Sequence, residues 1–256
     1  NRRSHLSGSK MSPIVRRNGA ESPMIQRAIV LVAAASTLWG ACDPAAREAQ
    51  KPAAPFAAEP SSGGTKSTLP TAEHYAHRLD EESRDRWQKP EEVVALLECR
   101  PGFTVVDLGA GTGYFLRYLS EAVGPEGRIL ALDVERSMVD EMYERIAREQ
   151  LRNVRPDGIT ADDPALAPRS VDRVLIVNTW HHIEDRVRYA TKLEEALRPG
   201  GRVLIVDFTA ESPFGPPEEH RLSIDTVTAE LRAAGLNVRT LEESLPHQYV
   251  VEGRVR

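Results

Sequence analysis

Short apolar runs alternate with amphipathic segments through the second half of the chain. The apolar runs that predict buried strands are 104–108, 128–133, 171–177, 202–208, 236–241 and 248–255. The segments with apolar residues at helical spacing are 114–123, 137–149, 185–197 and 225–234. Continuous apolar strands that alternate with helices are typical of a mostly parallel sheet covered on both faces. The pattern therefore predicts a doubly wound α/β fold.

Both ends of this alternating region depart from the simple repeat. The last two predicted strands have no helix between them, so we expect them to form an antiparallel hairpin at one edge of the sheet. Before the first strand, the polar segment 74–86 is expected to be helical, and a second helix is expected to begin at Pro90.

The first 42 residues follow a different pattern. The apolar run 28–41 follows a basic residue and ends in small residues before Cys42, which is typical of a secretory signal peptide. The run is shorter than the roughly 20 apolar residues that a membrane span needs. It also resembles a bacterial lipoprotein signal, in which the cysteine is lipidated, although Trp39 stands where that pattern prefers Leu. The segment before Met24 is either a misread start or a long basic leader.

Residues 43–70 are rich in Pro, Ala, Ser and Gly and carry few large apolar groups. Such a segment cannot offset its ordering entropy by burial, so we expect a flexible tether. The folded domain is then expected to cover 71–256. This organisation predicts an exported protein, periplasmic or anchored to a membrane through lipid on Cys42, with a cytoplasmic location as the alternative.

Composition narrows the function further. The chain has 256 residues, is 41% hydrophobic and has a formal net charge of −5, so it can bury one sizeable core and lacks the basic excess of a nucleic-acid binder. Its two cysteines, Cys42 and Cys99, make no disulfide framework. No Cys/His cluster has the spacing of metal ligands, so we expect no metal.

A glycine-rich turn joins the strand 104–108 to the following helix. It reads Asp107-Leu108-Gly109-Ala110-Gly111-Thr112-Gly113-Tyr114. Glycines allow positive φ and a close approach of ligand to backbone, and open α/β sheets bind ligands at the carboxyl ends of strands. The dinucleotide fingerprint requires a third glycine where Tyr114 stands, and Asp107 would repel a diphosphate but suit a cationic ligand. The turn therefore favours a nucleotide-like cofactor other than NAD.

Asp133 ends the second predicted strand. A carboxylate at this point can accept hydrogen bonds from both hydroxyls of a ribose, as in many adenosine sites. Alone, this acid or the glycine turn is a weak signal, and ordinary turn glycines with a strand-end Asp remain the alternative. The ordered combination of strand, Asp107, glycines, helix, strand and Asp133 is a strong one.

The combination resembles the first two motifs of the class I methyltransferases, which use S-adenosylmethionine. Further segments resemble their acidic adenine loop, fourth strand and the turn before the fifth strand, at 160–164, 170–174 and 197–202. The resemblance covers about 87–256 and implies a Rossmann-like methyltransferase fold with a seven-stranded sheet. Trp87-Gln88-Lys89-Pro90 and Thr179-Trp180-His181-His182 are similar to a group of exported bacterial methyltransferase-like proteins of unassigned substrate.

The resemblance also implies the cofactor site. Its expected members are Asp107, Gly109, Ala110, Gly111, Thr112, Gly113, Tyr114, Asp133, Val134, Asp162, Asp163 and Asn178. Asp107 is expected to approach the methionine part and Asp133 to bind the ribose. Asp162 is the expected adenine contact, and Asp163 is a close second because the length of their loop is ambiguous.

Methyl transfer from a sulfonium is a direct displacement, so no catalytic triad is required. Alignment of nucleophile, methyl and sulfur can contribute about 7–11 kcal/mol. A general base helps only where the nucleophile must lose a proton, and His181 or His182 is the candidate. For each histidine, a helix cap or a core position is the alternative. The residues expected at the acceptor or in a lid are Trp87, Gln88, Trp180, His220 and Arg221, with structural anchoring as their alternative.

Three functions follow from this reading. The first is a methyltransferase acting on a small-molecule or protein acceptor. The second is a non-catalytic module that binds adenosylmethionine or adenosylhomocysteine at a membrane, since an exported enzyme would lack a supply of cofactor. The third is an NAD-dependent oxidoreductase, which Tyr114 disfavours.

Overall fold

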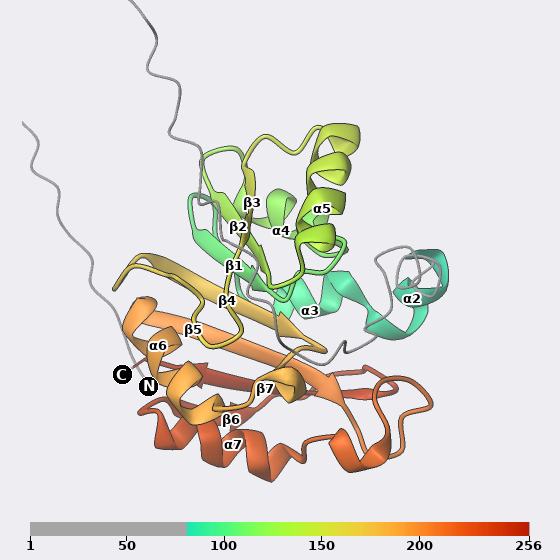
Figure 1. Ribbon diagram of the computed structural model, residues 1–256, viewed down its shortest axis with the longest axis vertical. Coiled ribbons are helices and arrows are strands. Elements are labelled where there is room, and N and C mark those ends of the chain that lie inside the picture. The colour runs from blue at the N-terminus through green and yellow to red at the C-terminus, as the bar shows by residue number, and fades with distance from the viewer. Residues whose placement is uncertain (1–80, 256) are drawn as a thin grey trace, which may run out of the picture. The chain divides into compact units, whose positions relative to one another are not determined.

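The computed structural model describes residues 81–255 (Figure 1). The predicted export segment at 1–42 and the tether at 43–70 lie outside these residues. Within the described part, no helix is long and apolar enough to cross a membrane.

The described residues form one seven-stranded sheet in the order β3-β2-β1-β4-β5-β7-β6. The strands are β1 Thr104–Leu108, β2 Arg128–Asp133, β3 Val154–Gly158, β4 Val171–Val177, β5 Leu197–Phe208, β6 Asn237–Thr240 and β7 Gln248–Arg254. Neighbours among β1 to β5 pair in parallel, whereas β7 is antiparallel to both β5 and β6. The predicted fold class and the antiparallel edge hairpin are confirmed.

Helices cover both faces of the sheet (Figure 1). They are α2 Glu81–Gln88, α3 Pro90–Leu96, α4 Leu116–Val123, α5 Arg136–Glu149, α6 Arg186–Ala196 and α7 Ile224–Ala233, with short 3-10 turns η1 Trp180–His182 and η2 Glu218–His220. One apolar core joins α3, α4 and α5 to the sheet, and a second joins α6 and α7 to the opposite face. The strands β1, β2, β4, β5 and β7 each supply residues to both cores, because successive side chains point to opposite faces.

The chain turns sharply between α2 and α3. Lys89 has a φ of 43°, and Pro90 begins α3 at a position where its missing N–H costs nothing. Glu92 in the first turn of α3 accepts a hydrogen bond from the Ser244 backbone N–H at 2.7 Å, which fixes the helix to the segment before β7. The bend directs α2 toward the carboxyl ends of the central strands.

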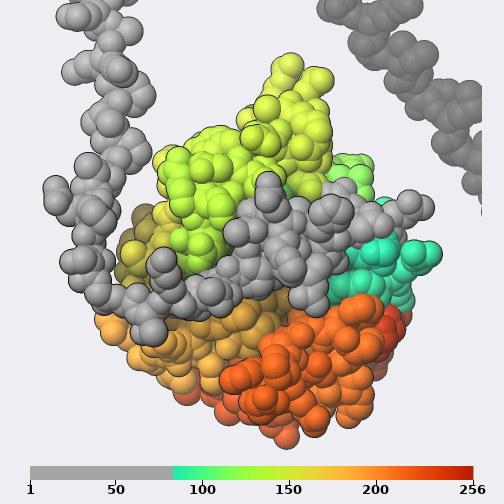
Figure 2. Space-filling model, turned by 45° about the vertical axis from the view of Figure 1, so that its right-hand side comes forward, coloured from blue at the N-terminus to red at the C-terminus, as the bar shows by residue number. Residues whose placement is uncertain are grey.

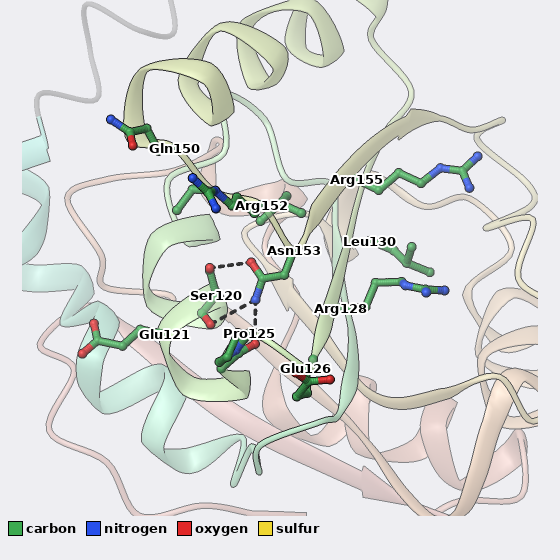
Figure 3. Close-up of a pocket in the computed structure, with 14 residues that line it drawn as sticks. Ser120, Glu121, Pro125, Glu126, Arg128, Leu130, Gln150, Arg152, Asn153 and Arg155 are labelled. Carbon is green, nitrogen blue, oxygen red and sulfur yellow. Dashed lines mark hydrogen bonds between the residues drawn. The ribbon is translucent and has the colours of Figure 1, made fainter.

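The pattern missed strand β3. Its sequence, Val-Arg-Pro-Asp-Gly, has no apolar run, and Pro156 lacks a backbone donor. An edge strand tolerates proline because one of its sides has no partner strand. Asn153 positions its start by donating to the Gly124 carbonyl at 2.9 Å and accepting from the Ser120 hydroxyl at 2.6 Å (Figure 3). The loop from β3 to β4 contains no helix, so the predicted alternation fails at this point.

Candidate functional site

The glycine turn after β1 is fastened to the end of β2. The backbone N–H groups of Gly109 and Ala110 both donate to the Leu132 carbonyl, at 2.8 and 3.1 Å. Gly109, Gly111 and Gly113 have φ values of 69°, 55° and 83°, which side chains rarely permit. The local fold therefore favours glycine at all three positions.

The first two glycines have different surroundings. A Cβ added to Gly109 would lie 2.3 Å from the Thr179 side chain, so this glycine lets the segment after β4 pack on the turn. A Cβ added to Gly111 would meet no atom within 4 Å. The backbone at Gly111 thus borders open space, as a bound ligand would require.

Backbone amides orient the Asp133 carboxylate at the end of β2. Gly111 N–H donates to Oδ2 at 2.8 Å, and Glu135 N–H donates to Oδ1 at 3.0 Å. The next side chain, Val134, is 53% exposed beside this carboxylate. An acid with fixed oxygens next to an exposed apolar side chain suits a ribose and the flat base attached to it.

Asp107 in β1 is 2% exposed, and its Oδ2 has no hydrogen-bond partner among the described residues. Burial raises the pKa of Asp107 to about 7; the Arg84 guanidinium opposes this rise, and the Asp133 carboxylate adds to it. A buried carboxylate without a partner is costly, so it favours a cationic ligand. The ammonium group of a methionine-type ligand meets this requirement.

Helix α2 brings Arg84 into the same region. Its guanidinium lies 3.9 Å from the centroid of the Tyr114 ring, and Nη2 donates to Gln88 Oε1 at 3.3 Å. The Tyr114 hydroxyl donates to Asp85, so this side chain joins α2 to the turn after β1. Sequence reasoning missed Arg84, because α2 is polar throughout and nothing local distinguishes this arginine from its neighbours.

Three side-chain amides close a ring that we call the amide ring: Gln88, Asn178 and Gln248. Gln88 donates to Gln248 at 2.6 Å, Gln248 donates to Asn178 at 2.5 Å, and Asn178 donates to Gln88 at 3.3 Å. Gln88 and Gln248 are buried. The ring ties α2 to the ends of β4 and β7, and it occupies the Asn178 amide that was expected to contact the cofactor. Gln248 was missed.

The two adjacent histidines differ in their partners. Nδ1 of His181 lies 2.9 and 3.0 Å from the Asp207 oxygens, and the two side chains are 4% and 3% exposed. A carboxylate accepts, so Nδ1 donates to it. The His182 ring lies 4.2 Å from the His181 ring, and burial together with charge on His181 lowers the pKa of His182. Asp207, the second-last residue of the apolar strand β5, was missed.

An aromatic cluster lies beside this pair; it consists of Trp87, Phe208, Phe214 and His247. Trp87 stacks on Phe214 with centroids 4.9 Å apart and lies 6.2 Å from Phe208. Phe214 meets His247 edge-on at 5.2 Å, and Phe208 lies 6.5 Å from His181. The stacking of Trp87 on Phe214 joins α2 to the loop after β5. In Figure 2 the teal surface of the first helices lies beside the orange surface of the C-terminal part of the chain.

Two of the other residues expected near the acceptor, Trp180 and Arg221, have structural partners. Trp180 is fully buried, and its Nε1 donates to Glu230 Oε2 at 2.9 Å, so it lies in the core instead of at the acceptor. Arg221 binds the loop that carries Phe214, donating to the carbonyls of Thr209, Ala210, Ser212, Phe214 and Pro216. His220 is exposed in η2.

The acidic loop after β3 presents its two carboxylates differently. Asp163 accepts from Ala165 N–H at 2.8 Å and pairs with Lys192 Nζ at 2.9 Å. Asp162 accepts from the Thr160 hydroxyl at 2.8 Å. The ion pair with Lys192 already neutralises the Asp163 carboxylate, which favours Asp162 as the one available to a ligand.

A hollow of about 1000 Å³ lies away from these groups, at the amino ends of β2 and β3 (Figure 3). Its lining includes Arg128, Arg152, Asn153 and Arg155, and no residue of the glycine turn. Ligands of open α/β sheets bind at the opposite, carboxyl ends of the strands, so we do not assign the cofactor to this hollow. Among residues 81–255, no group of three or more His, Cys, Asp or Glu side chains is placed to hold a metal ion.

Comparison with known proteins places this geometry among the methyltransferases. Residues 106–203 match a methyltransferase domain family. Arsenite methyltransferase of Halobacterium salinarum is 30% identical over 52% of this chain and 34% of its own length. The ubiquinone/menaquinone biosynthesis C-methyltransferase of Pasteurella multocida is 33% identical over 43% of this chain and 41% of its own. The chain therefore spans less than half the length of these curated relatives.

A solved structure matches over a larger share of the chain. The S-adenosylmethionine-dependent methyltransferase from Aquifex aeolicus superposes with a TM-score of 0.68 at 28% identity, covering 73% of this chain and all of that one. Residues 106–203 are therefore similar to a methyltransferase domain, and the described residues share the fold of an S-adenosylmethionine-dependent methyltransferase.

Proposed function

We propose that the protein transfers the methyl group of S-adenosylmethionine to an acceptor molecule. The observation that carries the proposal is the Asp107 carboxylate, buried beneath the glycine turn with Oδ2 unpartnered in the described residues. A cationic amino-acid group satisfies that oxygen, whereas a diphosphate would be repelled by it. The neighbouring Asp133 and the open space over Gly111 provide for the nucleoside.

Each part of the cofactor has a matching group. Asp107 would hold the ammonium of the methionine part. Arg84 would hold its carboxylate, because Arg84 lies close enough to Asp107 to oppose the rise in its pKa. Asp133 would accept the ribose hydroxyls, and Val134 would lie against the adenine. Asp162 is the preferred partner of the adenine amino group.

The turn itself would contribute backbone instead of side chains. Gly109 to Gly113, with Ala110 and Thr112 between the glycines, would follow the cofactor closely. Arg145 donates to the Thr112 carbonyl at 2.8 Å, which holds the turn in place when no ligand is bound. We assign Tyr114 and Asn178 to positioning α2, because their polar groups are engaged by Asp85 and by the amide ring.

When bound, the sulfonium supplies an activated methyl group, so the protein has to align the acceptor and exclude water. Alignment of this kind can contribute about 7–11 kcal/mol to catalysis. The turn η1 is placed for this role because Thr179 packs against Gly109 and His181 follows two residues later. Small-molecule and protein acceptors are both compatible with this arrangement.

A binding assay followed by a transfer assay tests the proposal. Calorimetry should show binding of adenosylmethionine and adenosylhomocysteine but not of NAD. Incubation with methyl-labelled cofactor and fractionated cell extract should then label an acceptor that mass spectrometry identifies. Tight cofactor binding without transfer to any fraction would favour the non-catalytic binding module instead.

The proposal extends to location. We propose that residues 1–42 direct export, that lipid on Cys42 anchors the chain and that 43–70 act as a tether. The support is the apolar run 28–41 with its small residues before the cysteine. Growth with labelled palmitate should label the wild-type chain but not Cys42→Ser. Labelling of neither, with the chain recovered in the cytosol, would contradict the export proposal.

A further inference from the structure

Two features with different chemistry meet at the carboxyl ends of β4 and β5. One is the pair of His181 and Asp207, and the other is the aromatic cluster around Trp87. They are continuous, because Phe208 directly follows Asp207 and its ring lies 6.5 Å from the His181 ring. His181, a candidate proton acceptor, and the aromatic cluster thus lie in one region beside the glycine turn.

Asp207 gives His181 a defined tautomer. The carboxylate accepts a hydrogen bond from Nδ1–H and another from Phe208 N–H at 2.9 Å, so its orientation is fixed. Nε2 is then the nitrogen that carries the lone pair, as in other carboxylate–histidine pairs. The Thr179 carbonyl accepts from His182 N–H at 2.9 Å, which joins the histidine turn to the residue packed on Gly109.

Contacts within the protein hold the aromatic cluster in place. The five carbonyls bound by Arg221 hold the loop that carries Phe214. Gly215, with a φ of 92°, lies so close to the Phe208 ring that an added Cβ would stand 2.4 Å from it. Phe214 nevertheless remains 42% exposed, which leaves aromatic surface for a flat molecule. Aromatic pairs in offset-stacked or edge-on arrangements are more favourable than their buried area alone predicts.

We propose that the methyl acceptor is a planar aromatic molecule with an ionisable hydroxyl group, which stacks beside Trp87 and Phe214 while His181 removes its proton. This inference rests on the proposed methyltransferase function and adds the acceptor class to it. A base is useful only when the nucleophile must lose a proton. A flat aromatic compound with a hydroxyl group meets this requirement and can also stack on the aromatic cluster.

The proposed transfer is a single direct displacement. The hydroxyl proton passes to His181 Nε2, and the oxygen lone pair forms a bond to the methyl carbon. The carbon–sulfur bond breaks, and its electron pair neutralises the sulfonium, leaving a thioether. The products are an aryl methyl ether, adenosylhomocysteine and a protonated imidazole that returns its proton to water. Asp207 takes no part in the proton transfer and acts as a positioning residue.

An acceptor panel tests the substrate class. The full chain with labelled adenosylmethionine should methylate 1-naphthol but not cyclohexanol, which is neither planar nor acidic, nor 1-naphthylamine, which lacks the hydroxyl. Trp87→Leu should raise the KM for 1-naphthol about tenfold, while Trp87→Phe should stay within threefold of wild type. Transfer to the amine alone, or no binding of 1-naphthol to the adenosylhomocysteine complex, would overturn the inference.

Variants of the histidine pair test the base. His181→Gln should lower kcat for 1-naphthol about 100-fold or more and remove the low-pH limb of the rate profile. With 4-nitrophenol, which ionises far more readily, the same variant should lose less than tenfold, because little proton transfer remains. Asp207→Asn should lower kcat for 1-naphthol by an intermediate factor and shift the low-pH limb of the rate profile. Equal losses with both phenols would make His181 structural, and a larger loss in His182→Gln would move the base to His182.

Failure of this inference is distinguishable from failure of the proposed function. Adenosylmethionine binding and label transfer to some other class of acceptor would leave the methyltransferase in place and remove only the aromatic hydroxyl. Absence of cofactor binding by calorimetry would remove both.

Discussion

Single residues carry the cofactor assignment, and Asp107 has the clearest signature. We expect Asp107→Asn to weaken adenosylhomocysteine binding about tenfold or more, because a charge-assisted contact is replaced by a neutral one. Calorimetry measures this. Asp140→Asn, which changes an exposed acid on α5, is the matched control and should bind like wild type.

The same carboxylate predicts a pH dependence. Burial raises its pKa from 3.8 to about 7, so the ligand-free fold retains a proton that the unfolded chain releases between those values. This group's contribution to stability therefore falls as pH rises through that window. Affinity for adenosylhomocysteine should instead rise from pH 6 to pH 8, since the ammonium binds the ionised form. Calorimetry across this range should show no such rise for Asp107→Asn; an equal rise would contradict the assignment.

Two glycines of the turn have different roles, one in the stability of the fold and one in cofactor binding. Gly109→Ala should lower the free energy of unfolding by about 2–3 kcal/mol, because the new methyl group overlaps Thr179 at positive φ. Gly111→Ala has open space and should cost about 1 kcal/mol, from its φ alone. It should still weaken cofactor binding strongly. Urea denaturation and calorimetry on both variants test this contrast, and equal stability of the two would refute it.

Sequence reasoning identified residues whose role follows from local order and missed those whose role depends on distant partners. Asp107 and Asp133 stand at fixed positions around the glycine turn, so a motif can find them. Asp207, Arg84 and Gln248 acquire their roles only when folding brings them to His181, Tyr114 and Gln88. No spacing along the chain records those contacts.

At the scale of elements, α2 depends on the amide ring. Gln248→Met keeps the volume of the side chain but removes the donor to Asn178 and the acceptor for Gln88, which leaves buried polar groups without partners. We expect a loss of about 1–3 kcal/mol and faster hydrogen exchange across residues 81–88. Gln150→Met, outside the ring, is the control. Unchanged exchange in α2 would show that other contacts hold this helix.

Element boundaries were predictable where burial is continuous. The bounds of β1, β2 and β4 agree with the apolar runs, because both faces of these central strands lie under helices. β3 lies at the edge and needs no such run, so Pro156 and its charged neighbours concealed it. β5 begins at Leu197, earlier than the Pro-Gly-Gly turn suggested, because the chain continues to pair with β4 across a register shift.

At the scale of the whole molecule, a ligand that binds only the folded state must stabilise all of it. Adenosylhomocysteine at one hundred times its dissociation constant should add about 2.7 kcal/mol to the free energy of unfolding. NAD at the same concentration should add nothing. Denaturant titration with each ligand tests this, and stabilisation by NAD would contradict the cofactor assignment.

Helix α2 has a consequence for the order of events in a catalytic cycle. Within eight residues it supplies Arg84 near the cofactor, Trp87 to the aromatic cluster and Gln88 to the amide ring. One short helix thus borders both ligands. Binding of either ligand would fix the position of α2 and so favour binding of the other. Thermodynamic linkage makes such an effect reciprocal: the two affinities rise by the same factor. The protein would then discriminate against an acceptor that arrives without its methyl donor, simply through the placement of one short helix.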